Sequence, residues 1–379
     1  MPKYRVAVSS GDRPGVPCEP GGSLSLVTDD LEPTVLAHVH GSLGRITLNR
    51  PRAINALDLG MIEAIASILD AWEEDADIDV VVLDGAGERG FCAGGDVRTL
   101  AAQISAGDPG ATAAFFRAEY ALNARIAEYP KPVVAFADGV TMGGGIGLAG
   151  HASVRVVTER SALAMPETRI GFTPDVGGTW LLAHAPGRLG EYLGLTGGTM
   201  DASDAVYAGF ADHVVPSANL DAVREALARR ADPSTATEIV LLFDETPPPS
   251  RLEAARAWID DAFSADTVAE IVQRLRARPE SDAAATADLL ESLSPTGLTV
   301  TLAAVRRARE LPDLRADLAQ EYGLVLWFAH TQPDLVEGIR AQLIDKDRSP
   351  KWRPAALADV APDLAATALA FEPETPLWS

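Results

Sequence analysis

The chain has 379 residues, of which 47% are hydrophobic and 23% are charged, a composition typical of globular proteins that excludes disordered and collagen-like chains. It contains 32 Lys and Arg residues against 54 Asp and Glu residues, so its formal net charge is −22. This excess of negative charge disfavours general binding to nucleic acid or to an anionic membrane, while a local basic pocket for an anionic ligand stays compatible with it.

The cysteine count and the hydropathy pattern indicate in which cellular compartment the protein is expected. Two cysteines, Cys18 and Cys92, are too few for a disulfide framework or a Cys-rich zinc site. The first 20 residues lack the long apolar run of a secretory signal, and no stretch reaches the roughly 18 uninterrupted apolar residues of a membrane helix. We therefore expect a cytoplasmic protein with no membrane partner.

Composition along the chain predicts three regions. Residues 1–33 are rich in Gly, Pro and Ser without periodicity, which predicts a poorly ordered extension. An α/β core is predicted over residues 34–225. A mostly helical C-terminal region is predicted over residues 226–379, because Ala, Leu, Arg, Asp and Glu recur there with helical spacing up to about residue 345.

Strands and helices alternate through the predicted core. Two short apolar runs around a glycine turn at residues 41–44 predict a hairpin, and an apolar stripe over residues 58–73 predicts a helix. The further predicted elements are strands at 80–83, 132–137 and 153–157 and helices at about 111–128, 176–195 and 203–210. Fully apolar strands between helices indicate a layered α/β fold.

Glycine-rich segments follow two of these strands, at residues 90–96 and 138–147. Because glycine has no Cβ, backbone N–H groups in such loops can approach a ligand closely. One N–H group from each loop could converge on a single oxygen, as an oxyanion hole for a thioester carbonyl that gains negative charge. Two tight turns between strand and helix are the simpler interpretation of the same spacing.

Residues 145–150 also match the G-x-G-x-x-G pattern of dinucleotide-binding proteins. That pattern alone is weak evidence, and it normally follows the first strand of its domain. More than one strand–helix pair precedes it here. A nicotinamide oxidoreductase is therefore an alternative that the position of the pattern disfavours.

Two acids stand in segments of unusual composition. Glu167 ends the apolar stretch that begins at Leu163, and Asp175 lies between Pro174 and a pair of glycines. Apolar neighbours desolvate a carboxylate, which raises its pKa and makes it a better base near neutral pH. A salt-bridged surface acid at Glu167 and a helix N-cap at Asp175 are the structural alternatives.

Other catalytic chemistries lack their signatures. The sequence has no G-x-S-x-G for a serine hydrolase, and no H-E-x-x-H or Cys/His cluster for a metal. Cys92, in a glycine loop, is predicted to be a small buried residue, and His151 and His184, two of six scattered histidines, are predicted to be structural rather than catalytic.

Taken together, these segments resemble the crotonase (enoyl-CoA hydratase/isomerase) superfamily over about residues 34–356. The resemblance implies a spiral core of ββα units, an acyl-CoA substrate, no metal, and no cofactor beyond the coenzyme A of the substrate itself. It is carried by the order and spacing of residues 46–57, 91–96, 143–147, 166–167 and 174–178.

A narrower similarity is to the hydrolase branch of that superfamily, the 3-hydroxyisobutyryl-CoA hydrolases. It implies hydrolysis of 3-hydroxyisobutyryl-CoA, an intermediate of valine breakdown, to 3-hydroxyisobutyrate and CoA. Phe172 and Thr173 stand where Leu-Phe is common in that branch, so the acyl preference stays open. The matching segments are residues 115–120, 141–148, 164–168, 174–178 and, outside the core of the wider superfamily, 343–354.

The resemblance also implies roles for individual residues. The oxyanion hole falls on the N–H groups of Gly95 and Gly144. Glu167 is implied to attack the thioester carbonyl or to act as general base for water, and Asp175 to orient the water or the substrate. Glu119 is implied to bind the substrate through its 3-hydroxyl. Contacts with CoA are implied at Arg52, Ala56, Ala93 and Asp96.

One position separates activities within the superfamily. Hydratases carry a second Glu shortly after the triple glycine, and this chain has Gly147 there, which disfavours a hydratase. A hydratase or isomerase of the same fold and a non-catalytic acyl-CoA-binding protein remain alternatives to the hydrolase. The sequence leaves open whether the chain forms a homo-oligomer.

Overall fold

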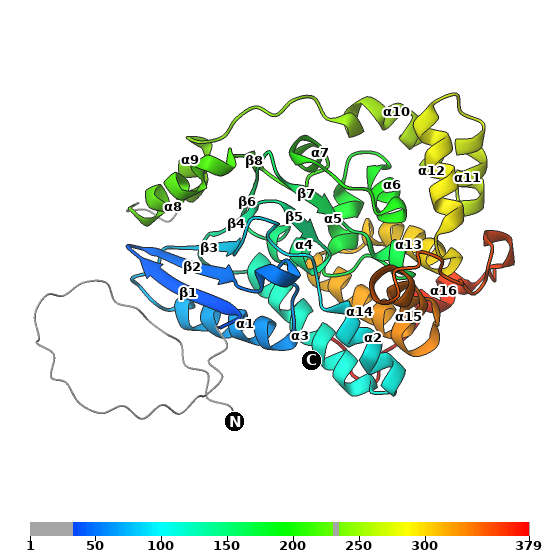
Figure 1. The fold of residues 1–379 in the computed structure, drawn as a ribbon, viewed down its shortest axis with the longest axis horizontal. Coiled ribbons are helices and arrows are strands. Elements are labelled where there is room, and N and C mark those ends of the chain that lie inside the picture. Colours follow the sequence, from blue (N-terminus) through cyan, green and yellow to red (C-terminus); the bar gives the residue numbers. More distant parts are fainter. Residues whose placement is uncertain (1–32, 230–234, 379) are drawn as a thin grey trace, which may run out of the picture.

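The computed structural model describes residues 33–229 and 235–378. The predicted extension lies outside the described residues, apart from its last position, and so does Cys18. The described part contains a large sheet with helices packed around it (Figure 1). The C-terminal helices lie beside the helices of the core, with α14 (Leu314–Thr331) packed on α3 (Pro109–Ala127) and α13 (Pro295–Ala308) on α6 (Leu189–Thr196).

The large sheet has six strands in the order β1-β2-β3-β4-β6-β8. The first two strands pair antiparallel as the predicted hairpin, and every further pair is parallel. β3 is buried along most of its length, as expected for a strand covered on both faces. The strands are β1 (Val35–His40), β2 (Leu43–Leu48), β3 (Val80–Gly85), β4 (Val133–Ala137), β6 (Val154–Val157) and β8 (His213–Val214).

A second, two-stranded sheet joins β5 (Val140–Met142) to β7 (Ala162–Ala164) in parallel. These strands follow β4 and β6 directly, so each long strand continues into a short one after a turn. The sequence did not indicate either short strand, because three residues are too few to show a period. The second glycine loop continues from β5 directly into α4 (Gly144–Ala149).

Helices of the predicted core surround the two sheets. The predicted helix over 176–195 is two helices, α5 and α6, with Pro186 between them, since proline disrupts a helix interior. The helix α2 was not predicted. The core helices are α1 (Leu59–Glu73), α2 (Val97–Ala106), α3 (Pro109–Ala127), α4 (Gly144–Ala149), α5 (Gly178–His184), α6 (Leu189–Thr196) and α7 (Ala202–Tyr207).

The C-terminal region is mostly helical, as its composition predicted. From α10 onward its helices share one hydrophobic cluster with the core, so that Ile46 and Phe328 belong to the same cluster. The helices α8 and α9 pack in a second cluster, against strands of the large sheet. The boundary at residues 225–226 stays a prediction. The helices are α8 (Leu220–Ala228), α9 (Ala236–Leu241), α10 (Arg251–Phe263), α11 (Val268–Arg276), α12 (Ser281–Ser292), α13 (Pro295–Ala308), α14 (Leu314–Thr331), α15 (Asp334–Ile339) with a π-helical turn Arg340–Ile344, and α16 (Leu364–Leu369).

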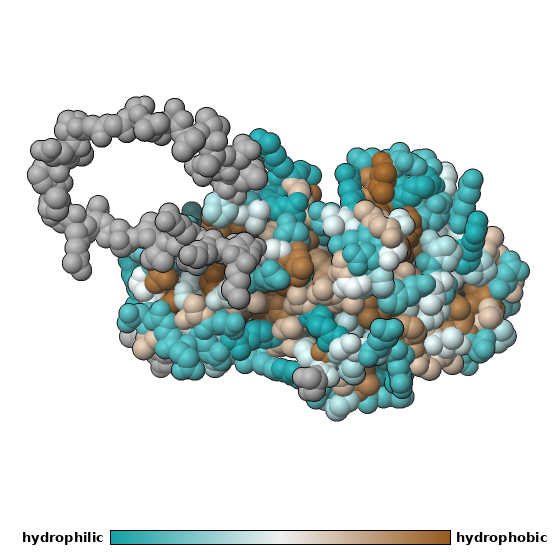
Figure 2. All heavy atoms as spheres, turned by 90° about the horizontal axis from the view of Figure 1, so that it is seen from below, coloured by the Kyte–Doolittle hydropathy of each residue, from teal (hydrophilic) through white to brown (hydrophobic). Residues whose placement is uncertain are grey.

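The surface is mostly hydrophilic in the view from below, with hydrophobic residues in limited areas between the polar ones (Figure 2). Within residues 33–229 and 235–378, no helix is both long enough and apolar enough to cross a membrane.

Candidate active site

A cavity of about 560 Å³ lies where the two glycine loops meet the helices. Its walls come from both loops, from α2 and α3, from the short 3₁₀ helix Glu167–Ile170, and from the π-helical turn Arg340–Ile344 of the C-terminal region. The lining is largely apolar, and Phe115, Phe116 and Phe172 contribute aromatic rings. A cavity with an apolar lining and a few polar groups suits a small organic substrate.

The two glycine loops run side by side along one wall. The N–H of Cys92 donates to the carbonyl of Val140 at 3.1 Å, and the N–H of Met142 donates to the carbonyl of Cys92 at 2.9 Å. A Cβ placed on Gly144 would lie 3.3 Å from the backbone nitrogen of Gly95, so these two glycines face one another. Neither N–H has a recorded acceptor among the described residues, which leaves both available to a ligand oxygen.

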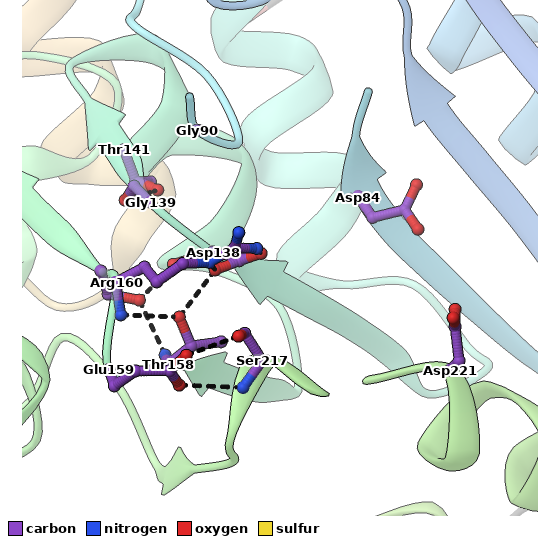
Figure 3. Close-up of polar contacts among 12 residues, drawn as sticks. Asp84, Gly90, Asp138, Gly139, Thr141, Thr158, Glu159, Arg160, Ser217 and Asp221 are labelled. Atoms are coloured by element: carbon purple, nitrogen blue, oxygen red, sulfur yellow. Dashed lines mark hydrogen bonds and ion pairs between the residues drawn. The ribbon is translucent and has the colours of Figure 1, made fainter. Parts of the chain in front are cut away.

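Polar contacts fix both loops where they leave the sheet. The side chain of Asn55 donates to the carbonyls of Gly90 and Phe91, at 3.2 and 3.0 Å. At the start of the second loop, Asp138 accepts from the hydroxyl of Thr158 at 2.7 Å and pairs with Arg160 (Figure 3). These contacts hold the loops before any ligand enters, as preorganised donors require.

Three buried carboxyl groups, those of Glu119, Glu167 and Asp175, line the same cavity. Glu119 comes from α3, Glu167 begins the 3₁₀ helix, and Asp175 lies in the loop before α5. A Cβ on Gly144 would be 2.5 Å from Oε1 of Glu119, and one on Gly143 would be 2.9 Å from Oε1 of Glu167. Both glutamates therefore lie against the second glycine loop.

Each of the two glutamates has one carboxyl oxygen without a hydrogen-bond partner in the described structure. In the described part of the chain, Oε1 of Glu119 and Oε2 of Glu167 are buried without a hydrogen-bond partner. Native proteins leave few buried polar atoms unsatisfied, and such atoms mark functional sites or unoccupied ligand positions. Asp175, in contrast, accepts a hydrogen bond of 2.8 Å from the hydroxyl of Tyr120.

Burial controls the protonation of these carboxyl groups. It raises the pKa of Glu119 and of Glu167 well above the usual range, and the nearby charge of Asp175 raises both further. Burial also raises the pKa of Asp175 to about 7, against the opposing effect of the Tyr120 hydrogen bond. Burial and mutual repulsion both oppose ionisation of all three carboxyl groups at once. The site therefore retains a proton near neutral pH.

A raised carboxyl pKa predicts how stability depends on pH. An unfolded Glu ionises near about pH 4.3, whereas folded Glu167 binds its proton up to a higher pH. The contribution of that proton to stability is present at low pH and is lost as the pH rises through the folded pKa. Glu167→Gln has no proton to lose, so we expect its Tm to exceed that of the wild type by about 1–3 °C at about pH 8, and by much less in acid.

The comparison requires calorimetry or circular dichroism at several pH values. Glu128→Gln is the matched control, because the Arg315 ion pair lowers the pKa of the exposed Glu128. Its Tm is expected to equal or fall below that of the wild type at the higher pH. A pH-independent difference between Glu167→Gln and the wild type would contradict the raised pKa.

The loop that carries Asp175 has a constrained backbone. Val176 has a φ of 58°, a left-handed conformation that is unusual for a β-branched residue. The ring of His151 is hydrogen bonded through Nε2 to the carbonyl of Val176 at 2.8 Å. Burial lowers the pKa of His151 to about 4, so the ring is neutral near pH 7 and donates its N–H to that carbonyl. His151 thus holds the loop, in agreement with its structural interpretation.

The other two residues interpreted as structural also lie in non-catalytic surroundings. Burial raises the pKa of the Cys92 thiol to about 12, which makes it a poor nucleophile. His184 ends α5, where its ring packs against Trp180 and Nδ1 is hydrogen bonded to the Trp180 carbonyl at 2.8 Å. His184 does not line the cavity.

The predicted CoA contacts divide into two groups. Ala93 and Asp96 line the cavity, whereas Arg52 and Ala56 do not. Arg52 is exposed in the 3₁₀ helix Pro51–Ala53. The carbonyl of Ala56 already accepts a hydrogen bond of 2.6 Å from the guanidinium of Arg50. The geometry therefore places two of the four predicted contacts outside the cavity wall.

Sequence reasoning gave no role to three residues that surround the site: Tyr120, Asn123 and Val176. Tyr120 binds Asp175, as described above. A Cβ on Gly147 would lie 2.7 Å from Cβ of Val176 and 2.8 Å from Nδ2 of Asn123. The space beside Gly147 is thus occupied, and a larger side chain does not fit there without displacing its neighbours.

The described residues include no group of three or more His, Cys, Asp or Glu side chains arranged to hold a metal ion.

Comparison with known proteins identifies the class. Residues 43–369 match the family model for enoyl-CoA hydratase/isomerase, and the chain belongs to that family. The predicted crotonase-like α/β fold is confirmed by a crystal structure of a carnitinyl-CoA dehydratase from Mycobacterium thermoresistibile, with a TM-score of 0.86 and 44% identity over 91% of this chain and 98% of that one. An enoyl-CoA hydratase from Rhodobacter sphaeroides gives a TM-score of 0.83 and 43% identity, over 89% of this chain and 97% of that one.

Curated relatives show which branch of the enoyl-CoA hydratase/isomerase family the chain resembles. The chain is 41% identical to the mitochondrial 3-hydroxyisobutyryl-CoA hydrolase of Danio rerio over 86% of both chains. It is 39% identical to that of Homo sapiens over 89% of this chain and 88% of the relative. The 3-hydroxyisobutyryl-CoA hydrolase 1 of Arabidopsis thaliana is also 39% identical, over 86% and 88%. The similarity to the hydrolase branch expected from the sequence is therefore confirmed.

These relatives correct one prediction. The animal relatives are named mitochondrial, which contradicts the cytoplasmic location expected from the sequence. Cysteine scarcity indicates a reducing compartment but does not distinguish one such compartment from another.

An acyl-CoA substrate is consistent with the family.

Proposed function

We propose that this protein is a thioester hydrolase that converts 3-hydroxyisobutyryl-CoA to 3-hydroxyisobutyrate and CoA, a step of valine breakdown. The observation that carries the proposal is the grouping of Glu167 and Asp175 with the free N–H groups of Gly95 and Gly144 in one cavity. This grouping provides a base or nucleophile and two donors for a carbonyl oxygen that gains negative charge.

Hydrolysis proceeds from the thioester carbonyl. The carbonyl oxygen accepts hydrogen bonds from the N–H groups of Gly95 and Gly144. These hydrogen bonds stabilise the negative charge of the tetrahedral intermediate. Glu167 either attacks the carbonyl carbon, giving an anhydride that water then cleaves, or removes a proton from an attacking water. Asp175 orients the water or the substrate. The C–S bond breaks, and the CoA thiolate takes up a proton.

Glu119 accounts for a preference for hydroxyacyl groups. Its buried Oε1 has no partner in the described structure and lies beside the second glycine loop, close to the proposed position of the thioester. A substrate hydroxyl would satisfy that oxygen. A site built to hydrogen-bond a hydroxyl strongly rejects the analogue without it, because the buried polar group is then left unpaired. Phe172 also lines the cavity, and its ring packs against the rings of Phe116 and Phe328.

A hydratase or dehydratase is the second candidate, since both similar crystal structures bear such names. Water addition across a double bond uses an acid and a base, and Gly147 supplies neither. The space that a side chain would need there is filled by Val176 and Asn123. This observation favours hydrolysis over hydration.

The packing around Gly147 gives a direct prediction. Gly147→Glu is expected to lower the Tm by several degrees, because overpacking a filled core costs roughly 1–3 kcal/mol, and to produce no hydration of crotonyl-CoA. Gly110→Glu is the control: Gly110 lies in the exposed first turn of α3, where a Cβ meets no atom closer than 3.6 Å. A stable Gly147→Glu variant that hydrates crotonyl-CoA would contradict the packing argument.

The proposed substrate is tested with a pair of thioesters. CoA thiol release is measured from 3-hydroxyisobutyryl-CoA and from isobutyryl-CoA, for the wild type and for Glu119→Gln. We expect the wild type to prefer the hydroxylated thioester in kcat/KM by at least about 10²-fold, and Glu119→Gln to lose most of that preference. Equal rates with both thioesters would show that the 3-hydroxyl is not recognised, and would overturn the proposed substrate.

A further inference from the structure

Two acidic residues of the C-terminal region bind the loop that carries Asp175. From α14, the carboxyl group of Glu321 accepts hydrogen bonds from the N–H of Gly177 at 2.6 Å and the N–H of Thr179 at 2.8 Å. The carboxyl group of Asp317 accepts from the N–H of Trp180 at 2.9 Å. The hydroxyl oxygen of Thr179 lies 2.7 Å from a carboxyl oxygen of Glu321 and 2.8 Å from one of Asp317, so its single hydrogen can be donated to either acid.

These contacts are inside the protein. Asp317 and Glu321 are fully buried, and burial raises the pKa of both carboxyl groups. Burying two acids of like charge is unfavourable unless each is well hydrogen bonded. The N–H groups that provide these hydrogen bonds belong to Gly177, Thr179 and Trp180, which follow Asp175 in the chain. The two buried acids therefore bind the segment that carries Asp175.

A second contact from α14 reaches Asp175 through Tyr120. The ring of Tyr322, one residue after Glu321, packs edge-on against the ring of Tyr120, with centroids 6.3 Å apart. The hydroxyl of Tyr120 donates to Asp175. Asp175 is therefore held from two directions by one helix, through its own loop and through the side chain that binds its carboxyl group.

We infer that Glu321 and Asp317 are positioning residues that hold the Asp175 loop from the C-terminal helix α14, so that the active site is incomplete without that helix. The inference rests on the proposed function, because it assumes that Asp175 orients the attacking water or the substrate. Neither acid lines the cavity, and neither is expected to touch the substrate. Their removal should therefore lower kcat and leave KM for the thioester nearly unchanged.

The test compares Glu321→Ala and Glu321→Gln with a packing control. Loss of the Gly177 and Thr179 contacts in Glu321→Ala is expected to reduce kcat by about 10²-fold, the effect of a displacement of roughly 1 Å in a catalytic group. Glu321→Gln keeps one acceptor oxygen, so we expect a smaller loss. Leu318→Ala is the control. Leu318 is buried on the same helix, but its hydrocarbon side chain forms no hydrogen bond with the Asp175 loop.

Leu318→Ala should lower the Tm, by the loss of buried methyl groups, while its kcat below the unfolding transition stays within about threefold of the wild type. A kcat for Glu321→Ala that matches the control at equal loss of Tm would overturn the inference. So would a raised KM with unchanged kcat.

Amide hydrogen exchange separates this inference from the proposed function. Glu321→Ala should speed exchange at the N–H groups of Gly177 and Thr179 more than Leu318→Ala does, whatever reaction the protein catalyses. A wild type that releases no thiol would refute the hydrolase proposal alone. Unchanged exchange at both amides in Glu321→Ala would refute the positioning inference alone.

Discussion

Replacing Glu167 by glutamine is expected to reduce kcat for 3-hydroxyisobutyryl-CoA hydrolysis by about 10²–10⁴-fold, the usual contribution of a general base or a nucleophile. Glu167 is buried, lies against the second glycine loop and has a free oxygen in the cavity. Glutamine has nearly the same shape, so CoA and acyl contacts persist and KM should change little. Glutamine neither accepts a proton from water nor attacks a thioester carbonyl usefully.

The raised pKa of Glu167 adds a pH dependence to this prediction. Because only the ionised carboxylate acts as base or nucleophile, wild-type kcat/KM should rise with pH through the raised pKa, which lies well above that of an ordinary Glu. Stopped or continuous thiol-release assays across pH measure both effects. Glu128→Gln again serves as the control, since its exposed side chain pairs with Arg315 away from the cavity. An acidic limb near the pKa of a free Glu would contradict the burial argument.

Gly144→Ala should be the other severe variant, with a loss of about 10²–10³-fold in kcat/KM, comparable to the removal of an oxyanion-hole donor. The new Cβ would lie 2.5 Å from Oε1 of Glu119 and 3.3 Å from the nitrogen of Gly95. It would therefore occupy the space between the two proposed donors and displace the group proposed to bind the substrate hydroxyl.

Gly95→Ala provides the contrast within the same structure. A Cβ there meets only the edge of the Phe115 ring, at 3.3 Å, which a small ring movement relieves. We expect its kcat/KM to stay within about tenfold of the wild type. The two alanine variants are compared by steady-state thiol release, with folding checked by circular dichroism. Equal activities for Gly144→Ala and Gly95→Ala would show that the two loops do not converge on the thioester.

Features with a strong local period could be predicted from the sequence. The hairpin, α1 and the buried strands β3 and β4 each have an apolar pattern that identifies them. The glycine loops and the acids Glu167 and Asp175 stand out by their local composition, whereas Glu119 and the grouping of the three acids in one site are implied only by the resemblance to a family. Their convergence on one cavity is a property of the tertiary structure that no local pattern contains.

Other features had no signal of their own. The strands β5 and β7 have three residues each, and α2 buries only Leu100 and Ala101. The contact between Glu321 and Gly177 joins residues 144 positions apart, and an acid on a helix predicts a solvent-exposed side chain until its partner is known. The predicted contact of Arg52 with CoA stays a prediction, because Arg52 is exposed and lies outside the cavity wall.

The most direct measurement is the release of CoA thiol from 3-hydroxyisobutyryl-CoA by the purified protein, with the acid product quantified in the same reaction. We predict one 3-hydroxyisobutyrate for each thiol released by the wild type, and almost no release by Glu167→Gln. Equal release by the two proteins would contradict the role of Glu167. Hydration of crotonyl-CoA without thiol release would contradict the hydrolase itself.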